Sequence, residues 1–398
     1  MELFKIEQNK IQSKATQING VWENALGESS SDIYMNVAQK LQTVNLTDVY
    51  DQIENDSKLK RDQIFGEDVV RLSDDLKTLN FHYTKNGLLT LNGFTSIPNA
   101  MFEYLFTKGY FADYASYANA ELEKRADSKR TSKKFLLRFR ELNSVEQIRG
   151  VMSDRYGIID HIDVAKAVLE SLPGGNLDCE VENYHNDGDT MGGNVIMPDY
   201  IKHHEDSDYS CGFHFGNSEI KRRTFTIKPY LYRAIDRTGY IWGRRDLAIN
   251  VNMKHLGNIS FDKIQSVVAS GVNSSLSMGQ SLIKLFEYAK DIPVDNGLRV
   301  IASLSRDYKL TTQIGKSWHK AYMSTNYSKT AFGIVNSLSI AAQEYGGTTR
   351  ELMEMSATQM LALSIDTTKE QMQKRWTNIN SKSQLLDAKI VQNYISNP

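Results

Sequence analysis

LDCEVENYH (177–185), GGNVIMPDY (192–200), YSCGFHFGNSE (209–219), RRTFTIKPYLYRAI (222–235) and GYIWGRRDLAINVN (239–252) follow one another in the middle of the chain. Each run has the length and the apolar content of a strand, and Gly or Asn stands at the breaks. Strands that are joined by short turns lie antiparallel to one another. Residues 176–255 therefore predict an antiparallel sheet of hairpins.

The segments before this sheet predict two further strands and two helices. KKFLLRFREL (133–142) and QIRGVMS (147–153) alternate as strands do, and IDVAKAVLESL (162–172) has apolar residues at helical spacing. Further upstream, LLTLNGFTSIP (88–98) contains a short strand-like run and a turn at Asn92-Gly93, and it opens the helix AMFEYLFTKGYFADY (100–114). A helical element and a pair of strands thus precede the sheet.

Beyond Ile259 the apolar residues return to helical spacing, and the first eighty residues are polar with scattered apolar positions. The predicted fold class is α+β, with a central antiparallel sheet of hairpins packed on helices. We expect a helical N-terminal arm in residues 1–80, an α+β core in residues 81–258 and a helical C-terminal unit in residues 259–398.

Composition limits the partners of the chain. Its 398 residues are 40% hydrophobic and carry a formal net charge of -1, so a core can form and any nucleic-acid site must be a local patch. No run of eighteen apolar residues and no signal-peptide pattern occurs, so we expect no membrane association. Two cysteines, Cys179 and Cys211, fit a reducing compartment such as a cytoplasm.

Positive charge concentrates in two blocks. Residues 121–140 contain eight basic residues against three acidic ones, and residues 221–254 contain nine against two. The second block interleaves its cations with Tyr230, Tyr232, Tyr240 and Trp242. Cations that follow phosphates and aromatic rings that stack on bases are the mixture that single-stranded nucleic acid favours.

A plainer interpretation stays open, in which the tyrosines fill the core of the sheet and the arginines form a solvated face. Residues 176–210 carry nine acidic residues and one lysine, so the charges are segregated along the chain. Segregated charge favours a directed surface, and it would equally suit association between copies of the chain.

Chemical motifs are weak. Cys211 and His214 have a spacing that zinc ligands use, but alternation would send them to opposite faces of a strand. Asp154, Asp160, His161 and Asp163 could bind a divalent cation, yet Asp160 or Asp163 serves equally well as a helix cap. We find no catalytic motif, no metal site and no cofactor signature, and therefore expect no enzymatic activity.

Three short motifs carry a family resemblance. They are Ser153-Asp154-Arg155-Tyr156 before a helix, Asn217-Ser218-Glu219 at a turn, and Pro229 to Arg233 in the following strand. With these motifs, residues 88–258 resemble a phage- and plasmid-borne family catalogued as domain of unknown function nine-three-two. The sequence departs from that family before residue 80 and at residues 234–239.

The genomic surroundings of that family, near replication and recombination genes, imply nucleic-acid metabolism. The arrangement also resembles the phage single-strand annealing proteins, which need cations and no catalytic residue. The expected activity is ATP-independent binding and annealing of single-stranded DNA by a homo-oligomer, with a phage exonuclease as a further partner. The residues expected to contact the strand are Lys133, Lys134, Arg138, Arg140, Arg222, Arg223, Lys228, Tyr232, Arg233, Trp242, Arg244 and Arg245.

Two rival functions stay open. The first is a phage structural or host-interaction protein that uses the same patch on an acidic partner. The second is a metal-dependent nuclease or ligase that uses Asp154 and Asp160. Loss of affinity with salt would separate DNA binding from the first rival, and magnesium-dependent cleavage or joining would indicate the second.

Overall fold

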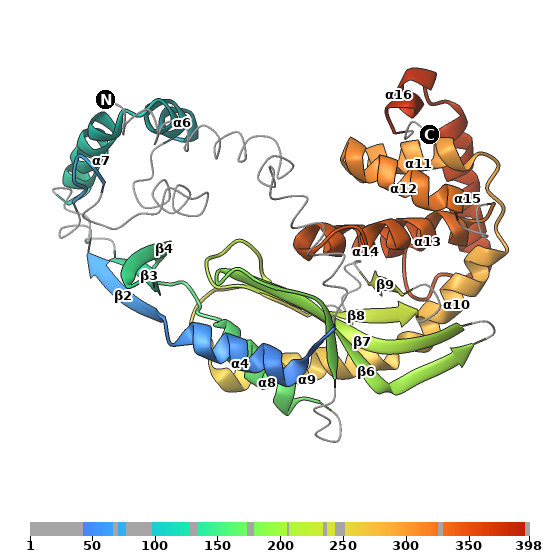
Figure 1. Cartoon of the computed structure of the whole chain (residues 1–398), viewed down its shortest axis with the longest axis horizontal. Coiled ribbons are helices and arrows are strands. Elements are labelled where there is room, and N and C mark those ends of the chain that lie inside the picture. Colours follow the sequence, from blue (N-terminus) through green and yellow to red (C-terminus); the bar gives the residue numbers. More distant parts are fainter. Residues whose placement is uncertain are drawn as a thin grey trace.

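The computed structural model describes residues 43–66, 71–76, 98–126, 134–172, 179–204, 207–233, 237–242, 251–324 and 329–394. Helices and antiparallel strands are segregated into layers, which confirms the predicted α+β class (Figure 1). The predicted strand at residues 88–91 and its turn lie outside the described residues, as do Lys133, Arg244 and Arg245.

The main sheet is antiparallel and has the strand order β1-β5-β6-β7-β8-β10, with β9 also paired to β8. Its centre is the meander that the apolar runs predict. The bounds are β1 Val44–Asn45, β5 Glu180–Asn186, β6 Thr190–His204, β7 Ser207–Ser218, β8 Phe225–Arg233, β9 Thr238–Ile241 and β10 Val251–Met253.

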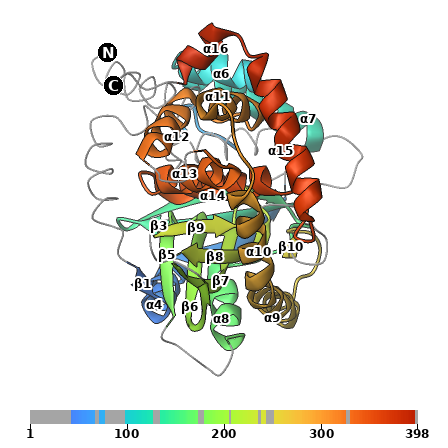
Figure 2. The ribbon, with the colours of Figure 1, turned by 90° about the vertical axis from the view of Figure 1, so that its right-hand side faces the viewer.

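One face of this sheet is apolar and packs on three helices. These are α4 (Leu46–Ser57), α8 (His161–Glu170) and α9 (Phe261–Ser277), which lie side by side below the sheet (Figures 1 and 2). Phe213 of β7 and Ile227 of β8 are fully buried in the core that the three helices share with the sheet. Burial of apolar area of this kind is the main force that holds such layers together.

The side chains that alternate with this apolar set, such as Glu182, Asn194 and His214, are polar and contact one of the helices of the C-terminal third. Those helices are α10 (Gly279–Lys290), α11 (Gly297–Asp307), α12 (Thr312–Ser324), α13 (Ala331–Ala342), α14 (Gly347–Leu361), α15 (Lys369–Gln384) and α16 (Ala388–Asn393). Figure 2 shows α13 and α14 directly above the sheet. A second core, which includes Trp318 and Trp376, joins these helices. The prediction of helices in the C-terminal third is confirmed.

A smaller sheet, β2-β3-β4, stands beside the main one and carries its own helices. Its strands are β2 (Lys60–Gly66), β3 (Lys134–Leu142) and β4 (Val145–Ser153). Helices α6 (Asn99–Thr107) and α7 (Phe111–Ala126) cover one face through a separate apolar cluster. The helix predicted over residues 100–114 is divided in two because Gly109 adopts φ of 79° between them.

Residues 44–66 contribute to both sheets. The described part of the expected N-terminal arm belongs to the two sheets. Val44 pairs with Val181 of β5, and Phe65 pairs with Phe135 of β3. Side chains of α4 lie in the core beneath the main sheet. Among the described helices, none is long and apolar enough to cross a membrane.

Candidate functional site

The structure divides the predicted contact residues by burial. Trp242 is completely buried among the side chains of the C-terminal helices, and Arg233 is 2% exposed with its guanidinium 5.5 Å from the centre of the Phe332 ring. Neither side chain can reach a nucleic acid in this conformation, so the predicted contacts of Trp242 and Arg233 are wrong. Alternating side chains of a strand point to two faces, and helices cover both faces of the main sheet.

Arg138 is the third buried residue among the predicted contact residues. Its guanidinium bonds to two carboxylates and a backbone carbonyl. Its Nε donates to Asp62 at 2.9 Å, one terminal nitrogen donates to the Glu219 carbonyl at 2.7 Å, and the other contacts Asp160. These ion pairs outweigh burial and raise the pKa of Arg138 above its ordinary value. The prediction that Arg138 contacts phosphate is therefore wrong.

Four predicted residues are half-buried on the strands or turns, namely Arg140, Arg223, Lys228 and Tyr232. Arg140 contacts Asp56 and donates to the Asp187 carbonyl at 3.0 Å, and Arg223 lies 3.0 Å from Glu351. Of the described members, only Lys134 and Arg222 are exposed, and Arg222 lies 3.6 Å from Asp187.

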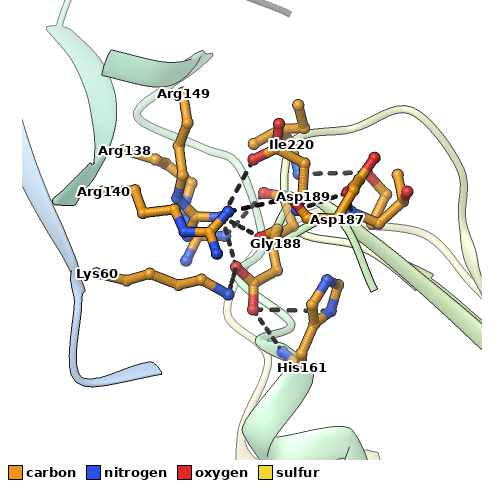
Figure 3. A network of polar contacts seen from close by, with 12 residues as sticks. Lys60, Arg138, Arg140, Arg149, His161, Asp187, Gly188, Asp189 and Ile220 are labelled. Carbon is orange, nitrogen blue, oxygen red and sulfur yellow. Dashed lines mark hydrogen bonds and ion pairs between the residues drawn. The ribbon is translucent and has the colours of Figure 1, made fainter. Parts of the chain in front are cut away.

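The network that contains Arg138 centres on Glu219, directly after β7. Figure 3 shows Lys60, Arg149 and His161 pointing toward one another in this network. Glu219 is 1% exposed and accepts a bond from Arg149 at 2.5 Å, and Lys60 Nζ lies 3.1 Å from it. Its other oxygen accepts the backbone N–H of His161 at 2.7 Å, at the first residue of α8. A carboxylate at a helix N-terminus satisfies a donor that has no intrahelical partner.

Asp160 occupies the cap position of α8, as one interpretation of the sequence expected, but its side chain makes no cap hydrogen bond. Glu219, a residue 58 positions away from His161, provides that bond instead. The Asn217-Ser218-Glu219 turn was noticed in the sequence only as part of a resemblance. No local pattern connects it to α8.

Burial and charge set the titration of the acidic members in opposite directions. Burial alone would raise the pKa of Glu219, but His161, Arg149 and Lys60 outweigh it and hold that pKa well below its usual range. At Asp189, burial outweighs the attraction of Arg149 and raises the pKa to about 6. The cations of this network are thus neutralised internally, and the network joins the small sheet to α8 and to the turns of the main sheet.

A second polar layer lies between the main sheet and α14. Arg350 of α14 donates to Glu354 at 2.7 Å and to Glu182 of β5 at 2.6 Å, and Tyr230 donates to the same Glu182. Asn194 donates to Glu354 at 3.1 Å. Burial, which outweighs Arg350, raises the pKa of Glu354 to about 7. The sequence analysis identified α14 only as a helix. Its charged residues within an apolar run could have indicated buried polar contacts.

This raised pKa predicts a pH dependence of stability. The unfolded chain releases the Glu354 proton near pH 4.5 and the folded protein near pH 7, so stability contributed by this group is present at low pH and falls as the pH rises through that interval. Between about pH 5 and pH 8, wild type should lose on the order of 2 kcal/mol relative to Glu354→Gln in urea unfolding. Glu344→Gln, at an exposed pair, should follow wild type. Parallel curves for wild type and Glu354→Gln would contradict the assignment.

The described residues offer little to metal chemistry. No group of three or more His, Cys, Asp or Glu side chains in this part of the chain could hold a metal ion. Asp154 is exposed, whereas Asp160 is in the Arg138 ion pair. Cys211 is buried against Gly279 of α10, whereas His214 bonds to Asn194 at 2.9 Å on the opposite face, as alternation predicted.

Four exposed cations from four separate segments form what we call the basic rim: Lys134, Arg155, Lys221 and Lys254. The pairing of Phe135 with Ser153 joins the segment of Lys134 to that of Arg155, and contacts of Tyr156 join the other two segments. Tyr156 pairs with Leu256, its hydroxyl donates to the Glu219 carbonyl at 3.2 Å, and the ring of His255 stacks on it with centroids 5.1 Å apart.

Close packing fixes the centre of the rim. The N–H of Gly257 donates to the Arg155 carbonyl at 3.1 Å, and a side chain at Gly157 would collide with the backbone of Leu256 at 2.8 Å. Leu256 itself is 67% exposed between the cations. Asp154 is the acidic residue beside Arg155, which leaves an excess of positive charge. The sequence predicted Lys134 as a binding residue but not Arg155, Lys221 or Lys254. The reason is that binding residues were chosen where cations lie close together within predicted strands.

No protein-family model, no curated protein and no solved structure matches the chain. The family resemblance drawn from the three short motifs stays a prediction. The features of this chain that bear on function are therefore the basic rim and the two buried networks.

Proposed function

We propose that the protein binds single-stranded DNA through the basic rim and promotes annealing of complementary strands without ATP. The observation that carries the proposal is the contrast between the rim and the other cations. In the two basic blocks, carboxylates lie beside Lys124, Arg138, Arg140, Arg222 and Arg223. By contrast, Lys134, Lys221 and Lys254 of the same blocks, together with Arg155, are exposed and have no ion-pair partner among the residues that the structure describes.

An exposed cation without a carboxylate partner can contact phosphate without first breaking an ion pair. Such contacts release counterions and supply affinity that does not depend on sequence. Leu256, held rigidly between the cations, offers an apolar contact to the face of a base. A surface of this kind binds the backbone and leaves base edges available for pairing, which annealing requires.

The same proposal includes the oligomeric state, the cellular location and a partner of the protein. We infer that the protein acts as a homo-oligomer in a host cytoplasm, in phage recombination or replication, beside an exonuclease that exposes single strands. The support is the segregation of acidic and basic segments along the chain, which suits contacts between copies.

A second candidate function has a specific observation in its favour. Met101, Tyr104, Tyr110 and Tyr117 are exposed on α6, on α7 and between the two helices, at 39–60% each, and the rings of Tyr104 and Tyr110 are in contact. Tyrosine is enriched at protein interfaces, where one ring buries a large area and keeps a polar group. These side chains suit contact with a host or phage protein, the alternative that needs no nucleic acid.

Fluorescence anisotropy tests the leading proposal. We expect the purified chain to bind a labelled oligothymidine more tightly than a duplex of equal length. With four phosphate contacts, the logarithm of the association constant should fall against the logarithm of salt concentration with a slope of about 3. Absence of binding at about 0.05 M salt would overturn the proposal and favour a protein partner instead.

A further inference from the structure

Lys228 occupies an unusual position on β8. Its side chain is half-buried on the polar face of the main sheet, where its Nζ lies 2.9 Å from the sulfur of Met355 on α14. Within the described ranges, no carboxylate lies within ion-pair distance of this amine, and its contact is a thioether that cannot balance a positive charge.

The charged neighbours of Lys228 come from three elements and the β7–β8 turn. Arg223, in the turn, lies 3.0 Å from Glu351 of α14, so the carboxylate that acts on Lys228 is already paired with another cation. His214 lies opposite Lys228 on β7, and His185 of β5 lies 3.5 Å from Glu351. A lysine beside a guanidinium and away from its own counter-ion is disfavoured as a cation.

His214 does not supply a compensating charge. Asn194 uses its amide nitrogen to donate to Glu354, so its oxygen accepts from Nδ1 of His214 at 2.9 Å. Burial, with Arg223 and Lys228 acting in the same direction, holds the pKa of His214 well below its ordinary value. His214 is therefore neutral, and its Nε2 lone pair faces the guanidinium of Arg223 at 3.4 Å.

These surroundings favour the neutral amine of Lys228. Burial first, and Arg223 second, lower the pKa of Lys228 to about 8, while Glu351 acts in the opposite direction. At pH 7 roughly a tenth of the side chains is then neutral, against roughly one in two thousand for an ordinary lysine. The neutral form is the nucleophile.

We propose that Lys228 is a reactive amine that condenses with small aldehydes to form an imine. The lone pair of Nζ attacks the carbonyl carbon, the carbinolamine loses one water, and the nitrogen becomes doubly bonded to that carbon. Arg223 and His185 are each 21% exposed at the side chain, so the cluster reaches the surface. The activity is independent of the proposed DNA binding.

Reductive trapping on the full-length protein tests this. Acetaldehyde and cyanoborohydride convert each imine into an ethylated lysine, and peptide mass spectrometry gives the rate at each site. Exposed Lys316 and Lys374 in the same molecule serve as references. At pH 7, Lys228 should react about 10-fold faster or more than the references. Its own rate should level off above about pH 8, whereas the rates of the references should keep rising, so its advantage should shrink there. A rate equal to or below those of the references would overturn the proposal.

Two variants test the cause. Arg223→Gln removes the neighbouring cation and releases Glu351, so the pH midpoint of Lys228 ethylation should rise. Glu351→Gln removes the one stabilising carboxylate, so the midpoint should fall. Arg222→Gln is the matched control, because that side chain is directed at Asp187 and Asp189. Midpoints for Arg223→Gln and Glu351→Gln that coincide would contradict the assigned environment.

Discussion

Replacing Lys134, Arg155, Lys221 and Lys254 together by glutamine should weaken single-strand binding by roughly 100-fold at about 0.1 M salt. Each lost phosphate contact removes released counterions, so the salt slope should also approach zero. All four side chains are exposed, so the free energy of unfolding should change by less than about 1 kcal/mol. Anisotropy titrations and urea unfolding of the same preparations measure the two effects.

The matched control removes four exposed cations from the C-terminal helices, namely Lys284, Lys316, Lys374 and Lys389. It changes the net charge equally and leaves the rim intact. If the rim carries the binding, the control should retain affinity to within about threefold. Equal losses in both variants would reduce the interaction to overall charge and would remove the basic rim from the proposal.

Substitution of Glu219 by glutamine should produce the largest loss of stability, on the order of 3–5 kcal/mol. The amide keeps the shape of the side chain but leaves Lys60 and Arg149 next to a neutral group in a buried site. It also weakens the bond that holds the first N–H of α8. Chemical denaturation by urea measures the loss.

Glu146→Gln is the comparison, because its pair with Arg61 is about half exposed and should be worth less than about 1 kcal/mol. The pH provides a second check on Glu219. A carboxylate whose folded pKa is depressed contributes stability above the unfolded value of 4.5, and this is lost as the pH falls toward the folded pKa. Wild type and Glu219→Gln should therefore converge in acid. If the difference in unfolding free energy between the two proteins stayed constant with pH, the assignment of Glu219 as a charged member of the network would be contradicted.

Local pattern predicted much of the fold. The strands from Glu180 to Arg233 follow from short apolar runs with turn residues between them, and α8 follows from helical spacing. Such elements depend on neighbours a few residues away, and sequence contains that information directly. The same reasoning failed for β2, whose sequence KRDQIFG has an irregular pattern and becomes a strand by pairing with β3.

The candidate site was predictable only in part. Alternation indicated that Lys134, Arg138 and Arg140 share one face, and this is where they lie. It could not indicate that Asp62 and Glu219, 76 and 81 positions from Arg138, neutralise that face. Charge density along a sequence counts cations, whereas binding depends on the cations that remain exposed after folding.

By itself, the sequence determined the α+β class, the antiparallel meander, the C-terminal helices and the placement of Cys211 and His214 on opposite faces. Tertiary structure alone decided that both faces of the sheet are covered, that Trp242 and Arg138 are buried, and that the segments of Arg155 and Lys254 meet across about a hundred residues of chain. The physical reason is range: periodicity reflects local backbone geometry, whereas burial and ion pairing depend on which distant segments pack together.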